Sequence, residues 1–363
     1  MKKLLFLPLI SILLGACSGN DVTTSFSSID IIIGENPHLV TLHTPVQSAF
    51  INDKKENVNL YARGVEELSR PTKPQISWDN GIGEYKITLS EYEDYSTSFI
   101  YQTSDASYSF TNLKIDTTYY YKVEDDLSII KEDYFTTSNE IIRTMYVSGV
   151  TNVRDLGGYM VDGYRTKQGL IYRGGRLNQN STEVVTNKIN EKGIKTMLED
   201  IKLSSEIDLR YVDNNEVGML TEGVGVLGES VKYYQCPMEY NSGRVSGEDN
   251  DASLRKVFTI LGDESNYPTY FHCSIGTDRT GYVAWLINAV IGVEEEYLWK
   301  DYLFSNFANI GGSRNVDTIK NGYVKDISTY AGSTLKEKAN RYLLDKGVKQ
   351  SDIDTLRNMM KGA

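Results

Sequence analysis

The stretch that decides the fold is His272 to Gly281, which reads H-C-S-I-G-T-D-R-T-G. It follows the apolar pair Tyr270-Phe271 and precedes the apolar run Tyr282 to Ile287. This pattern predicts a buried strand, a tight loop and the start of a helix. Five residues separate Cys273 from Arg279, enough to curl the backbone so that its N–H groups and the helix dipole face one anion. A thiol in that field ionises easily, so Cys273 is predicted to be a nucleophile beside a phosphate site.

Three further segments support this interpretation, and they occur in a fixed order along the chain. They are Asn152 to Tyr159 (N-V-R-D-L-G-G-Y), Ile171 to Gly175 (I-Y-R-G-G) and Ile207 to Arg210 (I-D-L-R). Together with the loop, they resemble the atypical bacterial protein tyrosine/serine phosphatase family. The resemblance covers residues 141–363. It implies an α/β fold with a cysteine-phosphatase-like central sheet flanked by helices, preceded here by a small all-β sandwich.

The resemblance and the chemistry of phosphoryl transfer assign roles to the loop. Cys273 attacks the phosphate and forms a phosphocysteine, which water then hydrolyses. The Arg279 guanidinium and the loop N–H groups hold the peripheral phosphate oxygens; these groups belong to Ser274, Ile275, Gly276, Thr277, Asp278 and Arg279. The Thr280 hydroxyl is expected to donate to the thiolate. His272 is expected to orient the loop rather than act as a base.

The leaving oxygen needs a proton, and three carboxyl groups are candidates for the general acid. Asp278 is the first choice, because related D-R-T loops use that position. Asp208 is second and Asp155 third, and each is alternatively a structural partner of an arginine. The supporting residues expected around the phosphate are Asn152, Arg154, Asp155, Arg173 and Arg210.

The substrate expected from the resemblance is protein phosphotyrosine, with inositol phosphates or phosphoinositides as the alternative. Thr277 stands where many family members have Lys, which lowers the expectation of phosphoinositide activity. A second alternative is a cell-surface binding protein with an idle phosphatase domain. No cofactor and no metal are expected, because the chain has only three histidines and a cysteine mechanism needs none. The net charge of −11 argues against nucleic acid as a partner.

The N-terminal sequence predicts that the protein is exported from the cytoplasm. Met1 to Lys3 is basic, Leu4 to Leu14 is apolar, and Leu14 to Cys17 resembles a bacterial lipobox. Residues 1–17 are therefore expected to be a lipoprotein signal peptide with Cys17 as the lipidated residue, and residues 18–35 a tether. The protein would be lipid-anchored on the outer side of a bacterial membrane. An unlipidated secreted form is the alternative.

The sequence of residues 36–138 predicts an all-β domain, because short runs of alternating apolar and polar residues are separated by turn residues such as Asn80-Gly81. The segment Leu113 to Val123 resembles the tyrosine-corner strand of a fibronectin type III domain. Residues 139–363 are expected to form the catalytic domain. The remaining cysteine, Cys236, is expected to be a buried strand residue; a Cys236–Cys273 disulfide would be the only framework available.

Overall fold

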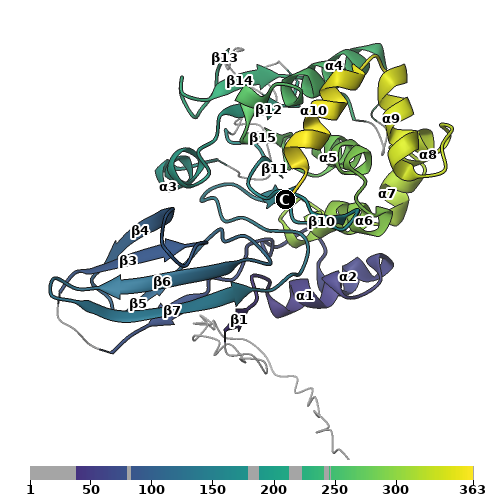
Figure 1. The fold of residues 1–363 in the computed structure, drawn as a ribbon. Helices are drawn as coiled ribbons and strands as arrows, with labels where there is room; N and C mark the ends of the chain where they lie inside the picture. Colours follow the sequence, from purple (N-terminus) through teal and green to yellow (C-terminus); the bar gives the residue numbers. More distant parts are fainter. Residues whose placement is uncertain are drawn as a thin grey trace, which may run out of the picture. The chain divides into compact units, whose positions relative to one another are not determined.

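The computed structural model describes residues 38–79, 83–178, 188–211, 223–240, 245 and 247–362 (Figure 1). The predicted signal peptide, the lipidation site at Cys17, the tether and the predicted turn at Asn80-Gly81 lie outside these residues. Among the described helices, none is both long and apolar enough to span a bilayer.

The N-terminal sheet has five strands in the order β1-β7-β6-β3-β4. These strands are β1 (Leu39–Val40), β3 (Tyr85–Ser90), β4 (Ser98–Thr103), β6 (Thr118–Glu124) and β7 (Ile129–Thr137), and a separate pair is β2 (Gln75–Ser77) with β5 (Ser107–Ser109). Alternate residues of β6 are buried, as the alternating pattern predicts. The Tyr119 hydroxyl accepts a hydrogen bond from the Lys114 N–H at 2.9 Å, the type of link that a tyrosine corner makes.

Residues 45–61 do not follow the all-β prediction. They form α1 (Pro45–Ile51), the short 3₁₀ helix η1 (Lys55–Asn57) and α2 (Val58–Tyr61). Helix α1 begins because Thr44 forms a capping box and Pro45 occupies the first turn. Its buried Phe50 packs against Phe304 and Phe307, with ring centroids 6.5 and 5.7 Å apart. This segment therefore packs into the core of the part of the chain after Ser138, although it precedes most strands of the N-terminal sheet in sequence.

The part of the chain after Ser138 contains a six-stranded sheet in the order β13-β14-β12-β15-β11-β8. Its strands are β8 (Arg154–Asp155), β11 (Ile171–Gly174), β12 (Ser205–Asp208), β13 (Gly223–Val224), β14 (Lys232–Gln235) and β15 (Thr269–His272), and a short hairpin joins β9 (Met160–Val161) to β10 (Tyr164–Arg165). The four central strands are parallel and the two edge strands are antiparallel. The predicted mixed α/β architecture is confirmed. The carboxyl ends of β11, β12 and β15 consequently meet at one edge.

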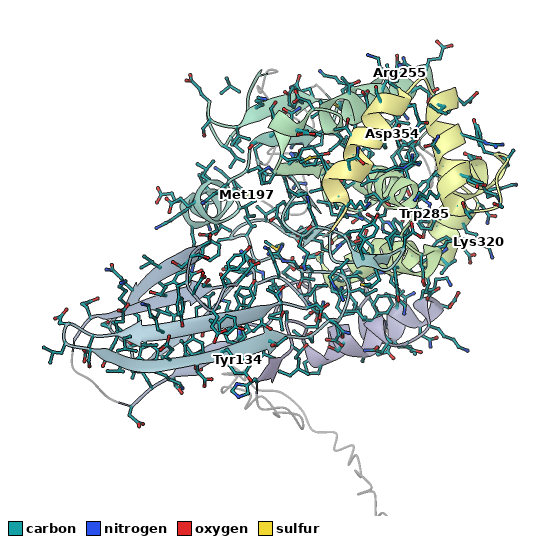
Figure 2. The ribbon with its side chains drawn as sticks, in the orientation of Figure 1. Tyr134, Met197, Arg255, Trp285, Lys320 and Asp354 are labelled. Atoms are coloured by element: carbon teal, nitrogen blue, oxygen red, sulfur yellow. The ribbon has the colours of Figure 1, made fainter. Side chains whose placement is uncertain are left out.

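Helices pack around this sheet. They are α3 (Glu191–Lys195), the π-helix η2 (Thr196–Asp200), α4 (Glu248–Leu261), η3 (Glu264–Asn266), α5 (Asp278–Ile291), α6 (Glu295–Leu303), η4 (Phe304–Phe307), α7 (Val316–Lys320), α8 (Tyr323–Ser328), α9 (Leu335–Asp345) and α10 (Gln350–Met360). Helix α5 is buried along almost its whole length, which fits its apolar sequence. Side chains fill the space between it and the surrounding helices (Figure 2), including the perpendicular pair Trp285 and Trp299. This packing fixes the start of α5, where the predicted site lies.

Candidate active site

The loop from Cys273 to Arg279, called the phosphate loop below, connects β15 to the first turn of α5. The helix begins at Asp278, and its N-cap Thr277 makes no side-chain capping bond. Among the described residues, the N–H groups of Ile275, Gly276 and Thr277 have no acceptor. Unpaired N–H groups at a helix N-terminus form a site for an anion. The loop therefore has the donors that the sequence predicts.

The loop carbonyl groups point the other way, into a scaffold of donors. Asn152 Nδ2 donates to the carbonyl oxygens of Ile275 and Gly276 at 3.1 Å, Arg173 Nη2 to that of Gly276 at 2.7 Å, and Arg176 Nη1 to that of Ser274 at 3.0 Å. Because these partners hold the carbonyl oxygens outward, the N–H groups face the concave side. Asn152 and Arg173 thus act on the loop backbone rather than on substrate.

Gly276 is required by its close approach to β11. Its φ is +71°, in the left-handed region, and a Cβ on this residue would lie 2.3 Å from the backbone carbon and oxygen of Gly174. No side chain fits at that distance, and non-glycine residues rarely adopt such a φ. The first glycine of the motif is thus explained by backbone packing.

The Cys273 thiol lies at the base of the loop and is 2% exposed. Burial raises its pKa, but the positive charge of Arg279, together with the hydroxyl and backbone N–H of Thr280, outweighs burial, so the thiol pKa lies below its ordinary value. Among the described residues the buried Thr280 hydroxyl has no other hydrogen-bond partner, which leaves it available to the sulfur. The residue is thus suited to be a nucleophile at neutral pH.

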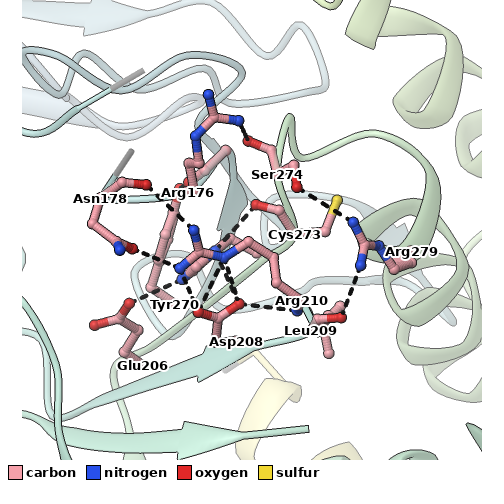
Figure 3. Close-up of polar contacts among 12 residues, drawn as sticks. Arg176, Asn178, Glu206, Asp208, Leu209, Arg210, Tyr270, Cys273, Ser274 and Arg279 are labelled. Carbon is pink, nitrogen blue, oxygen red and sulfur yellow. Dashed lines mark hydrogen bonds and ion pairs between the residues drawn. The ribbon is translucent and has the colours of Figure 1, made fainter. Parts of the chain in front are cut away.

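The guanidinium of Arg279 lies beside the Cys273 sulfur (Figure 3). Nη2 donates to the Ser274 hydroxyl at 3.3 Å, and Nη1 donates to the carbonyl oxygens of Leu209 and Met238, both at 3.4 Å. These bonds are long for a charged donor. A phosphate dianion placed over the sulfur would be a stronger acceptor than any of the three.

His272, at the end of β15, is held between two strands and the loop. Its Nε2 lies 2.9 Å from Oε1 of Glu206 on β12, and its Nδ1 lies 3.2 Å from the carbonyl oxygen of Cys273. Nδ1 also lies 3.8 Å from Oδ1 of Asp208. The imidazole therefore contacts both the neighbouring strand and the backbone next to the nucleophile. Glu206 was not anticipated as its partner.

Two of the three candidate acids are fully buried and bonded to an arginine. Asp208 pairs with Arg210 Nη2 at 2.6 Å and accepts from the Tyr233 hydroxyl at 2.8 Å. Burial by itself would raise the pKa of Asp208, but His272 and Arg210 together lower it by more than that. The pKa of Asp208 therefore lies below its ordinary value, and the carboxylate stays ionised. Asp155 pairs with Arg143 at 2.6 Å and also accepts two backbone N–H bonds.

Asp278 differs from those two carboxylates, because 13% of its side chain is exposed and it lies on the phosphate loop itself. Arg314 donates to both of its oxygens, at 2.9 and 3.1 Å, and the Tyr302 hydroxyl donates to Oδ1 at 3.2 Å. The hydrogen bond to Asp278 is the main cause that raises the pKa of Arg314. Sequence reasoning did not find Arg314, since its G-G-S-R context carries no motif.

Behind the loop, one carboxylate serves two buried arginines. Asp301, on α6, pairs with Arg173 at 2.5 Å and with Arg154 at 3.0 Å. Burial lowers the pKa of Arg154 to about 10, and the nearby charge of Arg173 contributes in the same direction. Burial opposes ionisation of Asp301, but the two guanidinium groups outweigh it and lower its pKa. Arg154 and Arg173 are therefore scaffold residues that share one buried counter-ion.

One group of metal-ligating side chains occurs in the described part of the chain. Ligand atoms of Glu206, Asp208 and His272 all lie within 4.8 Å of one another. Linear spacing gave no sign of this cluster, because the fold brings together two adjacent strands. Arg210 Nε donates to both carboxylate oxygens of Asp208, and Nη2 donates to Oδ2. The guanidinium therefore supplies to this cluster the positive charge that a metal ion would supply.

Most of the predicted site residues meet at the edge formed by β11, β12 and β15, and Asp155 lies in the scaffold. The two described cysteines do not approach each other as a disulfide needs. Cys236 follows β14 and Cys273 follows β15, and β12 pairs with both strands. Two strand spacings place their Cα atoms roughly 9–10 Å apart, beyond the ~6.8 Å limit of a disulfide. The disulfide considered from sequence is therefore wrong for this fold, and both thiols are free.

Comparisons with known proteins agree with this geometry. The tyrosine phosphatase family profile matches residues 145–361. One similar solved structure is the core catalytic domain of the PP-IP phosphatase SIW14 from S. cerevisiae in complex with citrate, with 17% identity and a TM-score of 0.31 over 49% of this chain and 92% of that one. Another is a Siw14 catalytic core, with 19% identity and a TM-score of 0.30 over 47% of this chain and 86% of that one. A third is P. aeruginosa TpbA, with 17% identity and a TM-score of 0.27 over 56% of this chain and 94% of that one. These likenesses are too distant to indicate a substrate. No curated protein matches the chain. The family match covers more than half of the sequence, and the chain belongs to the tyrosine phosphatase family.

Proposed function

We propose that this phosphatase hydrolyses phosphate monoesters, with protein phosphotyrosine as its substrate, through a phosphocysteine intermediate. The observation that carries the proposal is the arrangement of the phosphate loop. Among the described residues the N–H groups of Ile275 to Thr277 have no acceptor, and they follow a thiol of lowered pKa in the same loop; the Arg279 guanidinium lies beside the sulfur of that thiol. These are the groups needed to hold three phosphate oxygens while a nucleophile attacks in line.

The reaction takes two displacement steps at phosphorus. In the first, the Cys273 thiolate donates an electron pair to phosphorus, the S–P bond forms and the bond to the tyrosine oxygen breaks. The general acid gives its proton to that oxygen. In the second, a water oxygen attacks phosphorus, its proton returns to the same carboxylate, and the S–P bond breaks to restore the thiolate and release inorganic phosphate.

Asp278 is the carboxyl group that best fits the acid. It lies on the loop and is partly exposed, whereas the side chains of Asp208 and Asp155 are completely buried. Arg314 and Tyr302 fix its position.

The side chain at position 277 supports a protein substrate over a polyphosphorylated lipid. Thr277 is buried, and its hydroxyl lies 3.3 Å from Asn152 Nδ2 and 3.5 Å from the Ile275 carbonyl oxygen. The position where many family members have Lys therefore presents no charge to the substrate. A second anionic group on the substrate would lack that partner.

We also propose that the protein acts outside the cytoplasm, anchored to a bacterial membrane through lipid on Cys17. The support comes from the basic, apolar and lipobox-like segments of residues 1–17. Globomycin treatment of producing cells would test it, since blocked signal-peptide cleavage would leave a heavier precursor. An unchanged mass would contradict lipidation.

The test of activity is phosphate release from phosphotyrosine, phosphoserine and inositol phosphate substrates, with and without a chelator. Phosphotyrosine hydrolysis that survives chelation is expected. Cys273→Ser should lose turnover and still bind a phosphotyrosine peptide, because serine keeps the cradle but is a far weaker nucleophile. Cys236→Ala is the matched control, a buried cysteine outside the loop, and should remain active. Turnover by Cys273→Ser would disprove the mechanism.

A further inference from the structure

A short segment between α2 and β2 runs alongside the region that follows α6. Gly64 N donates to Asn306 O at 2.7 Å and Leu68 N to Phe307 O at 2.5 Å, while Gly64 O accepts from Ile310 N and Gly312 N at 3.0 Å. This segment, residues 64–69, is called the strap below. It lies outside residues 145–361, the range matched by the family profile. Its backbone bonds fix its position relative to the region after α6.

The strap presents a carboxylate and a hydroxyl to the start of the N-V-R-D-L-G-G-Y motif. Glu67 accepts from the Ser69 hydroxyl at 2.5 Å and, through its other oxygen, from the Thr151 hydroxyl. The Ser69 hydroxyl in turn accepts from the backbone N–H of Asn152 at 3.3 Å. Ser69 is 2% exposed and Asn152 fully buried, so these bonds are shielded from water.

Asn152 is the residue that holds the phosphate loop, and its backbone is in an unfavourable conformation. Its φ is +62°, a left-handed value that Asn tolerates only when its surroundings fix it. Its side chain donates to the carbonyl oxygens of Ile275 and Gly276. The preceding Thr151 carbonyl accepts from Gly175 N at 3.0 Å. Three consecutive hydrogen bonds therefore connect the Glu67 carboxylate to the loop: Glu67 to Ser69, Ser69 to Asn152, and Asn152 to the loop carbonyl groups.

We propose that Glu67 and Ser69 are positioning residues of the phosphatase site, which act through Asn152 to hold the phosphate loop in its anion-binding form. This inference rests on the proposed function. The strap is anchored on one side to residues 306–312 and on the other to Thr151 and Asn152. Its loss would release the Asn152 backbone and let the loop carbonyl groups turn inward, where they would repel a phosphate. The catalytic site is then incomplete without a segment that the family profile does not include.

The experiment compares Glu67→Gln, Ser69→Ala and the double variant in the full chain. Lys55→Ala is the matched control. It removes the 2.7 Å ion pair between Lys55 and Glu296, which also connects this N-terminal region to α6 but does not involve Asn152. We expect kcat/KM on an aryl phosphate to fall about tenfold in each strap variant, since a 1 Å misplacement of reacting groups costs roughly 100-fold and the expected displacement is smaller. The double variant should fall no further than the worse single one, because both act through Asn152. Lys55→Ala should keep wild-type kcat/KM.

A second readout needs no turnover. The rate of Cys273 alkylation by iodoacetamide against pH gives the thiol pKa, which should rise in the strap variants as the loop relaxes. A role limited to stability would lower Tm, leave this pKa unchanged and leave kcat/KM within twofold when measured well below Tm; that result overturns the inference. If the wild-type chain hydrolysed no phosphate ester, the proposed function would fail, and the alkylation profile would still decide whether the strap positions the loop.

Discussion

Nε2 of His272 and Oε1 of Glu206 lie 2.9 Å apart, and the other ring nitrogen of His272 faces the carbonyl oxygen of Cys273. The two contacts hold the imidazole between β12 and the backbone that carries the nucleophile. Because β12 and β15 pair in parallel, this link also fixes their spacing at the end where the phosphate loop begins.

Removing the Glu206 side chain should raise the pKa of Cys273. In the wild type, alkylation should reach half its maximum below the ordinary thiol pKa of about 8.5, because the thiol pKa is lowered. In Glu206→Ala the His272 ring loses the partner of Nε2 and holds the Cys273 backbone less firmly, so the loop relaxes and the midpoint should rise. Iodoacetamide alkylation against pH measures the midpoint, with the exposed Glu199→Ala as control. An unchanged midpoint would show that the contact between Glu206 and His272 does not position the loop.

The general acid can be identified by leaving-group dependence. Asp278→Asn should slow phosphotyrosine hydrolysis about 100-fold or more, the usual contribution of general acid catalysis. An ester with a good leaving group should slow far less, because it needs no proton. Asp208→Asn should depress hydrolysis of all esters alike, since the buried Arg210 loses the carboxylate with which it forms an ion pair. Rates on aryl phosphates of graded leaving-group pKa decide the assignment; a steeper dependence for Asp208→Asn would give the role to Asp208.

Gly276→Ala should abolish activity, because the added Cβ would collide with the Gly174 backbone at 2.3 Å and occupy a left-handed φ. The loop must then move away from Asn152 and Arg173. The matched change is Gly163→Ala, at a left-handed glycine with open space around it, which should destabilise the fold but keep kcat/KM. Equal activity losses in the two variants would count against loop displacement. Phosphate release and thermal unfolding separate the effects.

Asp301→Asn should destabilise the fold by about 3–5 kcal/mol, the usual cost of removing one partner from a buried ion pair, because Arg154 and Arg173 would keep their charges without it. The folded-state pKa of Asp301 is lowered, so its contribution is present above the unfolded pKa of about 4 and is lost as pH falls. Denaturant unfolding should show a large difference from wild type at pH 7 that shrinks toward pH 3. A difference independent of pH would indicate lost packing instead of lost charge.

The phosphate loop and its neighbours could be predicted because their signal is local. The apolar run before His272, the spacing from Cys273 to Arg279 and the helix after Gly281 all lie within one short stretch. Local patterns in the sequence also predict helices at residues 252–261, 294–304, 335–344 and 351–360, and these correspond to α4, α6 with η4, α9 and α10. The same kind of pattern predicts a helix at residues 183–198; its part from Glu191 lies in α3 and η2, and residues 183–187 lie outside the described residues.

The partners of the site residues could not be predicted, because they depend on tertiary contacts. Arg314 is 36 residues from Asp278, and Glu206 is 66 residues from His272. Neither has a local pattern that marks it. Helix α1 is a different case: its Thr44 cap and Pro45 are local signals, but the surrounding alternating sequence favoured strands. The fibronectin type III-like identity of the sandwich and the lipid anchor stay predictions.

The position of β12 between Cys236 and Cys273 has a consequence for how the enzyme survives oxidants. A reactive thiolate is readily converted to a sulfenic acid, and many thiol enzymes trap that state with a neighbouring cysteine before it oxidises further. Within the described residues no second thiol can reach Cys273. An oxidised Cys273 would therefore need a thiol other than that of Cys236 for its repair, and without one it would proceed to the irreversible sulfinic and sulfonic acids.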